Sequence, residues 1–252
     1  MTNFELTLVK SYLINLRTRH LEFKIINHDS FNFNAGQFIS LHIKKNSEII
    51  RRNFSIANAP NQLTKNTIEI AATFVPNGIA SSTLWSMQIG EHLEASGPYG
   101  IFVLKPEDFK IVKRCILVAT GTGVTPYRSM LNNLQILLQQ HQELTIVLLL
   151  GVRDKQELLY GNDFVNFAKN NSKFKFIACY SRQSDNIDVN FENTGYVQNK
   201  LLQLNINPKQ DLIYLCGNPN MIDQSLSALE ALGMPKNKIR REKYISTPIK
   251  LK

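Results

Sequence analysis

Residues 119–126, Ala-Thr-Gly-Thr-Gly-Val-Thr-Pro, have the composition of a phosphate-binding loop. They follow a run typical of a buried strand and precede residues at helical spacing. Glycines permit a tight turn and let a phosphate approach the backbone, and a helix start offers free N–H groups and a positive dipole end. Pro126 suits the first helical turn, where a missing N–H has no consequence. The segment favours phosphate binding over a plain connection, although a proline replaces the third glycine of the standard dinucleotide fingerprint.

Two further segments end predicted strands. In Arg52-Asn53-Phe54-Ser55 the arginine can pair with a phosphate, the aromatic ring can stack on a flat ring, and the serine can hydrogen-bond to a ring nitrogen. Residues 216–221, Cys-Gly-Asn-Pro-Asn-Met, precede a helix, and ligands of open α/β sheets lie beyond such strand ends. Taken alone, each segment is better explained as an ordinary strand with a core phenylalanine or a small buried cysteine.

The elements that must position these residues differ between the two parts of the chain. Residues 1–105 show short alternating runs, typical of half-buried antiparallel strands, and one helix near 79–87. Several short strands over such a length predict a barrel or sandwich. The alternating runs begin at Phe4, Leu21, Ile39 and Ile68, and turn signals lie at 27–30, 34–36 and 58–61.

From Lys113 onward, buried-type strands alternate with helices, which predicts a parallel sheet with helices on both faces. We therefore expect two domains, 1–106 and 107–252, with the boundary near Lys105–Pro106. The predicted strands are 115–119, 144–150, 174–180 and 212–216, and the predicted helices are 126–140, 163–169, 197–204 and 221–232.

Composition and charge limit the function further. Of the 252 residues 43% are apolar, no apolar run is long enough to span a bilayer, and the start lacks a signal-peptide pattern, so we expect a cytoplasmic protein without membrane insertion. The three cysteines are far apart and the five histidines are scattered, which argues against a disulfide framework, an iron–sulfur cluster and a metal site. The net charge of +9 suits an acidic partner, but the cations are dispersed, so nucleic-acid binding is not expected.

Five motifs, taken in order, resemble those of the ferredoxin–NADP⁺ reductase superfamily over nearly the whole chain. The resemblance implies an antiparallel β-barrel that binds FAD, followed by an α/β parallel-sheet domain that binds NADP(H). The motifs are Arg52–Ser55, Gly78–Leu84, Gly97–Gly100, Gly121–Pro126 and Cys216–Gly217.

The resemblance also implies roles in flavin binding. Arg52 would bind the FAD pyrophosphate, Phe54 would stack on the isoalloxazine, and Ser55 would lie near flavin N5. The family usually has tyrosine at position 54, so one hydrogen bond to the flavin chain is missing here. The segment wrapping the pyrophosphate would contribute Gly78, Ser81, Ser82 and Thr83.

Roles at the nicotinamide dinucleotide follow in the same way. Gly121, Thr122 and Gly123 would hold its phosphates, and Cys216 would lie beside the nicotinamide and help orient it toward flavin N5. Pro126, Gly217 and Met221 would also belong to the cofactor-binding set. Three segments resemble the family's NADP-selecting positions, although each alone is typical of a solvated surface. They are Ser181-Arg182, Arg153 and Tyr196, whose ring would stack on adenine. We therefore expect NADPH to be preferred over NADH.

The role of the chain's end has two interpretations. The Glu242-x-Tyr244 spacing resembles that of plant-type members, so Tyr244 would stack on the flavin and the tail 245–252 would gate nicotinamide entry. Alternatively, Tyr244 is only the end of the last strand.

The expected activity is that of a monomeric, FAD-dependent NADPH reductase with an acidic ferredoxin or flavodoxin as its partner. The chain has no cluster of cysteines for iron–sulfur binding, so the carrier must be another molecule. The alternatives are a flavin reductase or an oxygenase reductase component, which often prefer NADH, an electron-transfer subunit, and a flavin-binding module without turnover.

Overall fold

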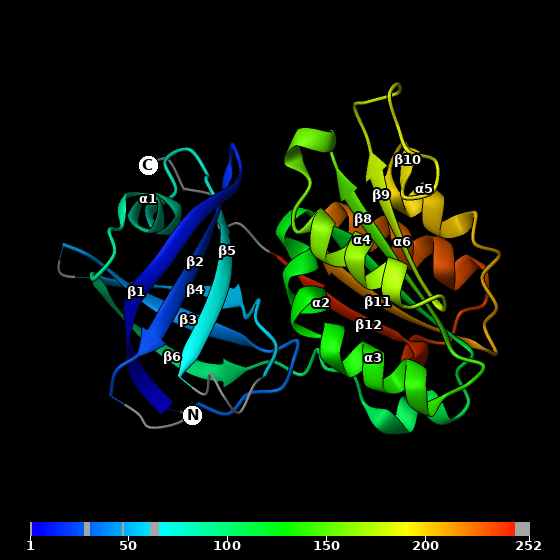
Figure 1. Cartoon of the computed structure of the whole chain (residues 1–252), viewed down its shortest axis with the longest axis horizontal. Helices are drawn as coiled ribbons and strands as arrows, with labels where there is room; N and C mark the ends of the chain where they lie inside the picture. Colours follow the sequence, from blue (N-terminus) through cyan, green and yellow to red (C-terminus); the bar gives the residue numbers. More distant parts are fainter. Residues whose placement is uncertain (1, 28–30, 47, 61–65, 245–252) are drawn as a thin grey trace. The chain divides into compact units, whose positions relative to one another are not determined.

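The computed structural model describes residues 2–27, 31–46, 48–60 and 66–244. The chain forms two compact units (Figure 1). The first comprises 1–106, 125–140 and 162–164, and the second comprises 107–124, 141–161 and 165–252. The domain limits 1–106 and 107–252 stay a prediction. Of the expected turn and tail segments, residues 28–30, 61 and 245–252 lie outside the described residues.

The first unit contains a six-stranded antiparallel sheet in the order β4-β3-β6-β1-β2-β5. Its outermost strands, β4 and β5, also contact each other, so the sheet curves into a barrel. The strands are β1 (Thr2–Asn15), β2 (Thr18–Ile25), β3 (Phe38–Lys45), β4 (Glu48–Ser55), β5 (Thr67–Thr73) and β6 (His92–Tyr99).

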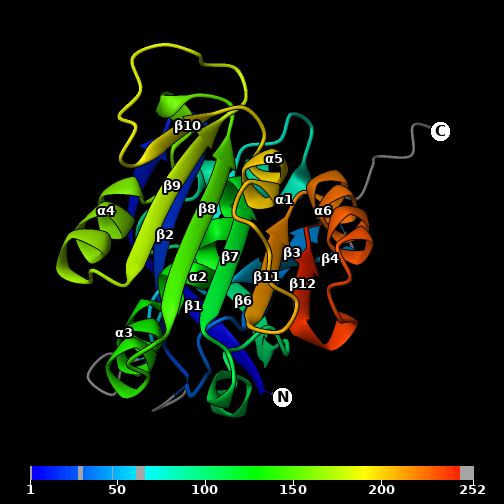
Figure 2. The ribbon, with the colours of Figure 1, turned by 90° about the vertical axis from the view of Figure 1, so that its right-hand side faces the viewer.

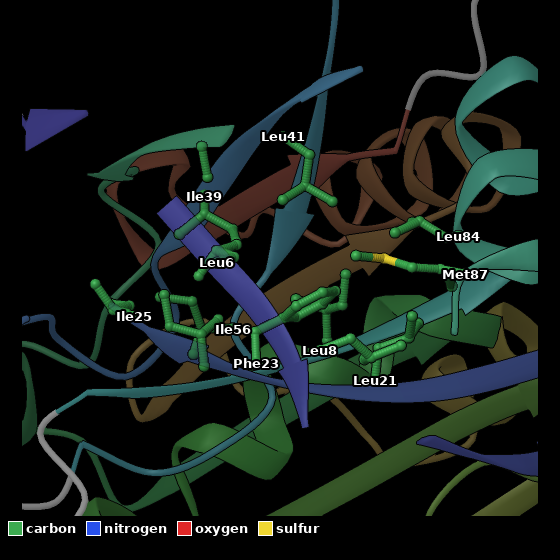
Figure 3. Packing of buried hydrophobic residues seen from close by; sticks show 14 of the residues in the cluster. Leu6, Leu8, Leu21, Phe23, Ile25, Ile39, Leu41, Ile56, Leu84 and Met87 are labelled. Atoms are coloured by element: carbon green, nitrogen blue, oxygen red, sulfur yellow. The ribbon is translucent and has the colours of Figure 1, made fainter. Parts of the chain in front are cut away.

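Period-two patterning explains the barrel core. Leu6 and Leu8 of β1, and Leu21 and Phe23 of β2, lie on the inner face and are fully buried (Figure 3). Helix α1 (Ile79–Ser86) packs against β3 and β5, and Leu84 joins this core. The alternating apolar side chains of the strands therefore pack against one another inside the barrel.

Two helices that follow the loop after β7 belong to the first unit. They are α2 (Thr125–Ser129) and α3 (Leu131–Gln140). The Ser129 hydroxyl donates to the carbonyl of Asn58 at 2.7 Å, and the Arg128 guanidinium pairs with the Glu69 carboxylate at 2.6 Å. These bonds hold α2 against the segments beside β5.

The second unit contains a six-stranded parallel sheet in the order β10-β9-β8-β7-β11-β12 (Figure 2). The chain builds outward from β7 to β10 and then returns to the other side of β7 with β11, so the strand order reverses between β7 and β11. Ligands of such sheets bind beyond the carboxyl ends of the strands at this switch point. The strands are β7 (Arg114–Thr120), β8 (Thr145–Val152), β9 (Phe174–Tyr180), β10 (Glu192–Thr194), β11 (Asp211–Gly217) and β12 (Ile239–Lys243).

Helices connect these strands, and their apolar sides join the buried sheet. Leu201 and Ile222 are fully buried in one cluster with strand residues such as Val118. The described helices include none long and apolar enough to cross a bilayer. The helices are α4 (Gly161–Asn170), α5 (Val197–Leu202) and α6 (Pro219–Ala231), and the 3₁₀ segments are η1 (Pro106–Lys110), η2 (Gly121–Val124), η3 (Lys155–Glu157) and η4 (Lys236–Lys238).

The expected fold class is confirmed: an antiparallel barrel is followed by a parallel sheet with helices. Strand 174–180 has the predicted bounds, and the predicted helix 126–140 is present but interrupted at Met130. The short strand β10 and the 3₁₀ segments η1 to η4 were not predicted, because segments of three to five residues carry no measurable period.

Candidate functional site

Two strand ends meet at the switch point of the parallel sheet. After β7 the chain forms η2, and β11 ends at Gly217. A Cβ atom on Gly123 would lie 2.3 Å from the Cys216 carbonyl oxygen and 2.7 Å from Cα of Gly217. A Cβ atom on Gly217, whose φ is +124°, would lie 2.6 Å from Oγ1 of Thr120. Only glycines allow this approach, so the structure brings the predicted loop and the Cys-Gly segment together.

Gly121 of this loop borders open space. Its φ is +52°, and a Cβ atom there would meet no heavy atom within 4 Å. Thr122 beside it is half-buried, and Pro126 is buried as the second residue of α2. The hydroxyl of Thr125 is buried without a hydrogen-bond partner among the described residues. A loop with bare backbone on its open side fits a phosphate-bearing ligand.

Cys216 is fully buried at the end of β11. Burial raises the pKa of its thiol well above the usual value, the Glu242 carboxylate adds to the rise, and a side-chain hydrogen bond with Tyr244 opposes it. The thiol therefore stays protonated at neutral pH and suits a neutral contact rather than a nucleophile. The backbone N–H of Tyr244 donates to the Gly217 carbonyl at 2.8 Å, which places this residue beside the same strand end.

The helix after this strand end begins with a side-chain cap. The Asn218 amide oxygen accepts the backbone N–H groups of Asn220 and Met221 at 2.8 and 3.4 Å. The Met221 side chain is 4% exposed and lies in the hydrophobic core of the second unit. Its expected part in cofactor binding stays a prediction, and its observed contacts are those of a core residue.

The predicted NADP-selecting residues gather at the ends of β8, β9 and β10. The backbone N–H of Arg182 donates to the Arg153 carbonyl at 2.8 Å, and that of Ser181 donates to the Val152 carbonyl at 3.0 Å. The Tyr196 side chain follows β10 and is 61% exposed, so its ring is open to stacking. Residues far apart in sequence therefore share one edge of the sheet.

Sequence reasoning missed the carboxylates of this edge. The Arg153 guanidinium donates through Nε to Oε2 of Glu157 at 2.7 Å, and its second nitrogen pairs with Oε1. Lys155 pairs with Glu192 at 3.0 Å, and the Glu192 carboxylate also accepts the hydroxyl of Tyr180 at 2.8 Å. The four-residue spacing from Arg153 to Glu157 was the one available signal, and it is common in any chain.

The flavin-binding residues expected on β4 lie on one strand of the barrel. Phe54 opposes Ile39 of β3, and Arg52 opposes Leu41, so the two side chains share a face. Arg52 is half-buried, and its guanidinium donates to the Arg51 carbonyl at 2.8 Å. Ser55 is 7% exposed at the end of the strand. That face also carries the buried Ile39 and Leu41, and the partly buried Phe54 packs against the barrel core.

The two predicted serines lie in the first turn of α1, and one of them bonds to the loop before the helix. The Ser81 hydroxyl accepts the Val75 N–H at 3.1 Å and lies within donating distance of the carbonyls of Val75 and Gly78. Ser82 is exposed, and the Thr83 hydroxyl donates to the Ile79 carbonyl at 3.0 Å. Ser82 is thus the serine whose side chain faces solvent at the helix start, and Ser81 shapes the loop.

Comparisons with known proteins agree with this arrangement. The oxidoreductase FAD-binding domain family matches residues 5–104, and the oxidoreductase NAD-binding domain family matches residues 117–226. The chain is 32% identical over 226 residues to the flavodoxin/ferredoxin–NADP reductase of Buchnera aphidicola subsp. Baizongia pistaciae, covering 86% of this chain and 87% of that protein. The chain belongs to the ferredoxin–NADP reductase family. It is an oxidoreductase with an FAD-binding and an NAD(P)-binding domain.

Sequences similar to this chain also occur within longer proteins. This chain is 28% identical over 230 residues to the propane 2-monooxygenase reductase component of Mycolicibacterium smegmatis, and it spans 63% of that relative's length. The solved ferredoxin NADP⁺ reductase of Neisseria gonorrhoeae, with bound FAD and NADP, superposes with a TM-score of 0.81 at 22% identity. That likeness covers 96% of this chain and 99% of the solved one, and it shows the shared fold.

Proposed function

We propose that this flavoenzyme exchanges hydride between NADPH and FAD, and single electrons between FAD and an acidic carrier such as a ferredoxin or flavodoxin. The observation that carries the proposal is the meeting of Gly121–Val124 with Cys216–Gly217 at the switch point. A protein that only binds flavin needs no nicotinamide site, so the presence of this junction favours an enzyme over a flavin-binding module. FAD, when bound, accepts two electrons as hydride and releases them singly.

The chain's own residues supply binding and orientation. The glycine loop offers backbone N–H groups to phosphates, and the Cys216 thiol, buried and protonated beneath the strand end, would add no charge where the nicotinamide would lie. Arg52 and Phe54 share the strand face on which the flavin would rest. Arg182 would bind the 2′-phosphate, since its side chain is exposed and no ion pair is formed by it among the described residues. Binding and orienting the reacting groups is the main catalytic contribution of such a scaffold.

The carrier is inferred from charge and from the family. A net charge of +9 attracts an acidic protein, and such attraction weakens as salt rises. We further propose a cytoplasmic location, because the three cysteines are free, buried thiols, as a reducing compartment permits. The expected monomeric state stays a prediction.

The first experiment is an anaerobic stopped-flow titration of the FAD-loaded protein, with NADPH and NADH compared by bleaching of the visible flavin band. Faster bleaching by NADPH supports the proposal. Faster bleaching by NADH would instead favour an oxygenase reductase or flavin reductase. No bleaching with either nucleotide would overturn the proposal in favour of a flavin-binding module.

Two variants test the assigned residues. Arg182→Ala is expected to raise the KM for NADPH while changing that for NADH little, and an equal loss with both nucleotides would contradict the 2′-phosphate role. Cys216→Ser is expected to lower kcat more than it weakens FAD binding, and unchanged hydride transfer would remove Cys216 from the mechanism.

A further inference from the structure

The edge proposed to select NADPH is not a positive surface. Residues 152–160 and 181–196 together carry three cationic and five acidic side chains, whereas the whole chain has a net charge of +9. A 2′-phosphate site is expected to be cationic. The excess of carboxylates at this edge therefore needs an explanation.

Two of the three cations are already paired. Arg153 forms a two-point pair with Glu157, in which Nε and one terminal nitrogen of the guanidinium contact the two carboxylate oxygens. Lys155 pairs with the Glu192 carboxylate, whose side chain is 8% exposed and which also accepts the N–H of Asp188 at 2.7 Å. Only Arg182 has a side chain outside such pairs among the described residues of this edge.

The Glu157 pair is held in place by the local backbone. Glu157 ends η3, and its own N–H donates to the Asp154 side chain at 3.2 Å, which caps that segment. The Arg153 carbonyl in turn accepts the N–H of Arg182 at 2.8 Å. Glu157 therefore pairs with Arg153, whose backbone in turn is hydrogen-bonded to that of Arg182, the second arginine expected to meet a 2′-phosphate.

We propose that Glu157 sets the selectivity between NADPH and NADH by holding the Arg153 guanidinium away from a 2′-phosphate. A carboxylate in this position repels a phosphate, and it can accept a hydrogen bond from a free ribose 2′-hydroxyl. The pair thereby reduces discrimination and lets the enzyme use both nucleotides. This inference rests on the proposed nicotinamide site but not on the identity of the electron acceptor.

The test measures binding of 2′,5′-ADP and 5′-AMP to the FAD-loaded protein by calorimetry, because these adenylates differ only in the 2′-phosphate. Glu157→Gln is expected to increase the ratio of affinities, 2′,5′-ADP over 5′-AMP, about three- to tenfold. Glu157→Ala should give an increase at least as large. In a protein that already carries Arg153→Gln, the same change at Glu157 should have a smaller effect, because it then removes only the direct repulsion between carboxylate and phosphate.

Glu143→Gln is the matched control. Glu143 pairs with Lys113 at 2.8 Å and precedes β8, whereas Glu157 follows it. The eight-residue strand separates the two carboxylates by roughly 25 Å, well beyond the screening length. This variant removes the same charge as Glu157→Gln does, but at a position too distant to affect the bound phosphate. It should therefore leave the affinity ratio unchanged.

The outcomes separate this inference from the proposed function. An unchanged ratio in Glu157→Gln, or an equal increase in Glu143→Gln, overturns the inference. A gain of undiminished size without Arg153 overturns the pairing account, and so does failure of the unaltered protein to bind either adenylate. If binding responds as expected but neither nucleotide bleaches the flavin, the inference stands and the reductase function falls.

Discussion

Replacing Gly123 by alanine tests the junction on which the proposed function depends. The new Cβ would lie 2.3 Å from the carbonyl oxygen of Cys216, 2.7 Å from its carbonyl carbon and 2.7 Å from Cα of Gly217. Carbon contacts are favourable at about 3.5–4.0 Å, so the loop must move by about 1 Å. All three contacts are with backbone atoms of a central strand, so no flexible side chain can yield.

The expected loss of stability is about 2–3 kcal/mol, as for other overpacked cores. With a typical slope for a chain of this size, that loss lowers the urea midpoint by roughly 1 M. A displacement of about 1 Å at a reacting site can lower the rate about a hundredfold, so kcat/KM for NADPH should fall by that order.

Gly121→Ala is the matched control for stability. Its Cβ would meet no heavy atom within 4 Å, but its φ is +52°, so only the conformational penalty of about 1 kcal/mol applies. Unfolding is followed by far-ultraviolet circular dichroism. If Gly123→Ala unfolds at the same urea concentration as Gly121→Ala, the close packing of the loop on β11 is refuted.

Three further predictions concern buried ionisable groups. Arg114→Met should destabilise the protein by about 3 kcal/mol in urea unfolding, because it leaves the Asp211 carboxylate, 1% exposed, without its cation; a loss below about 1 kcal/mol would contradict this. Burial lowers the pKa of His20 to about 4, so the unfolded chain binds an extra proton between pH 6.5 and 4. Stability should fall on acidification through that window, by at most about 1.4 kcal/mol per pH unit, and a His20→Gln variant with the same slope would argue against His20 as the cause. Burial raises the pKa of all three cysteine thiols, that of Cys179 to about 12, so a thiol reagent at pH 8 should label none before unfolding; rapid labelling of the native protein would contradict their burial.

Local patterns in the sequence were sufficient for the type of each domain. Alternation in runs such as that beginning at Leu21 reports which side of a strand is buried, and the residues from Lys113 onward report helices between buried strands. Each signal arises within a single helix or strand, so it can be read without knowing which other elements pack beside it. The order of five short motifs was likewise readable, and it led to the family that the comparisons show.

Only the tertiary structure decided what those residues touch. Gly123 and Gly217 lie far apart in the chain, and their contact depends on β11 returning beside β7. Ser81 and Ser82 are neighbours of one type, yet loop geometry turns one hydroxyl inward and leaves the other exposed.

The same limit explains the missed carboxylates. The pairing of Lys155 with Glu192 joins the segment that follows β8 to the first residue of β10, and no sequence period reports it. Sequence determined which residues could do chemistry and in which kind of element they lie, because propensity and patterning are local. Topology and packing decided which charges cancel and which remain open to a ligand, because those energies depend on neighbours brought together by the fold.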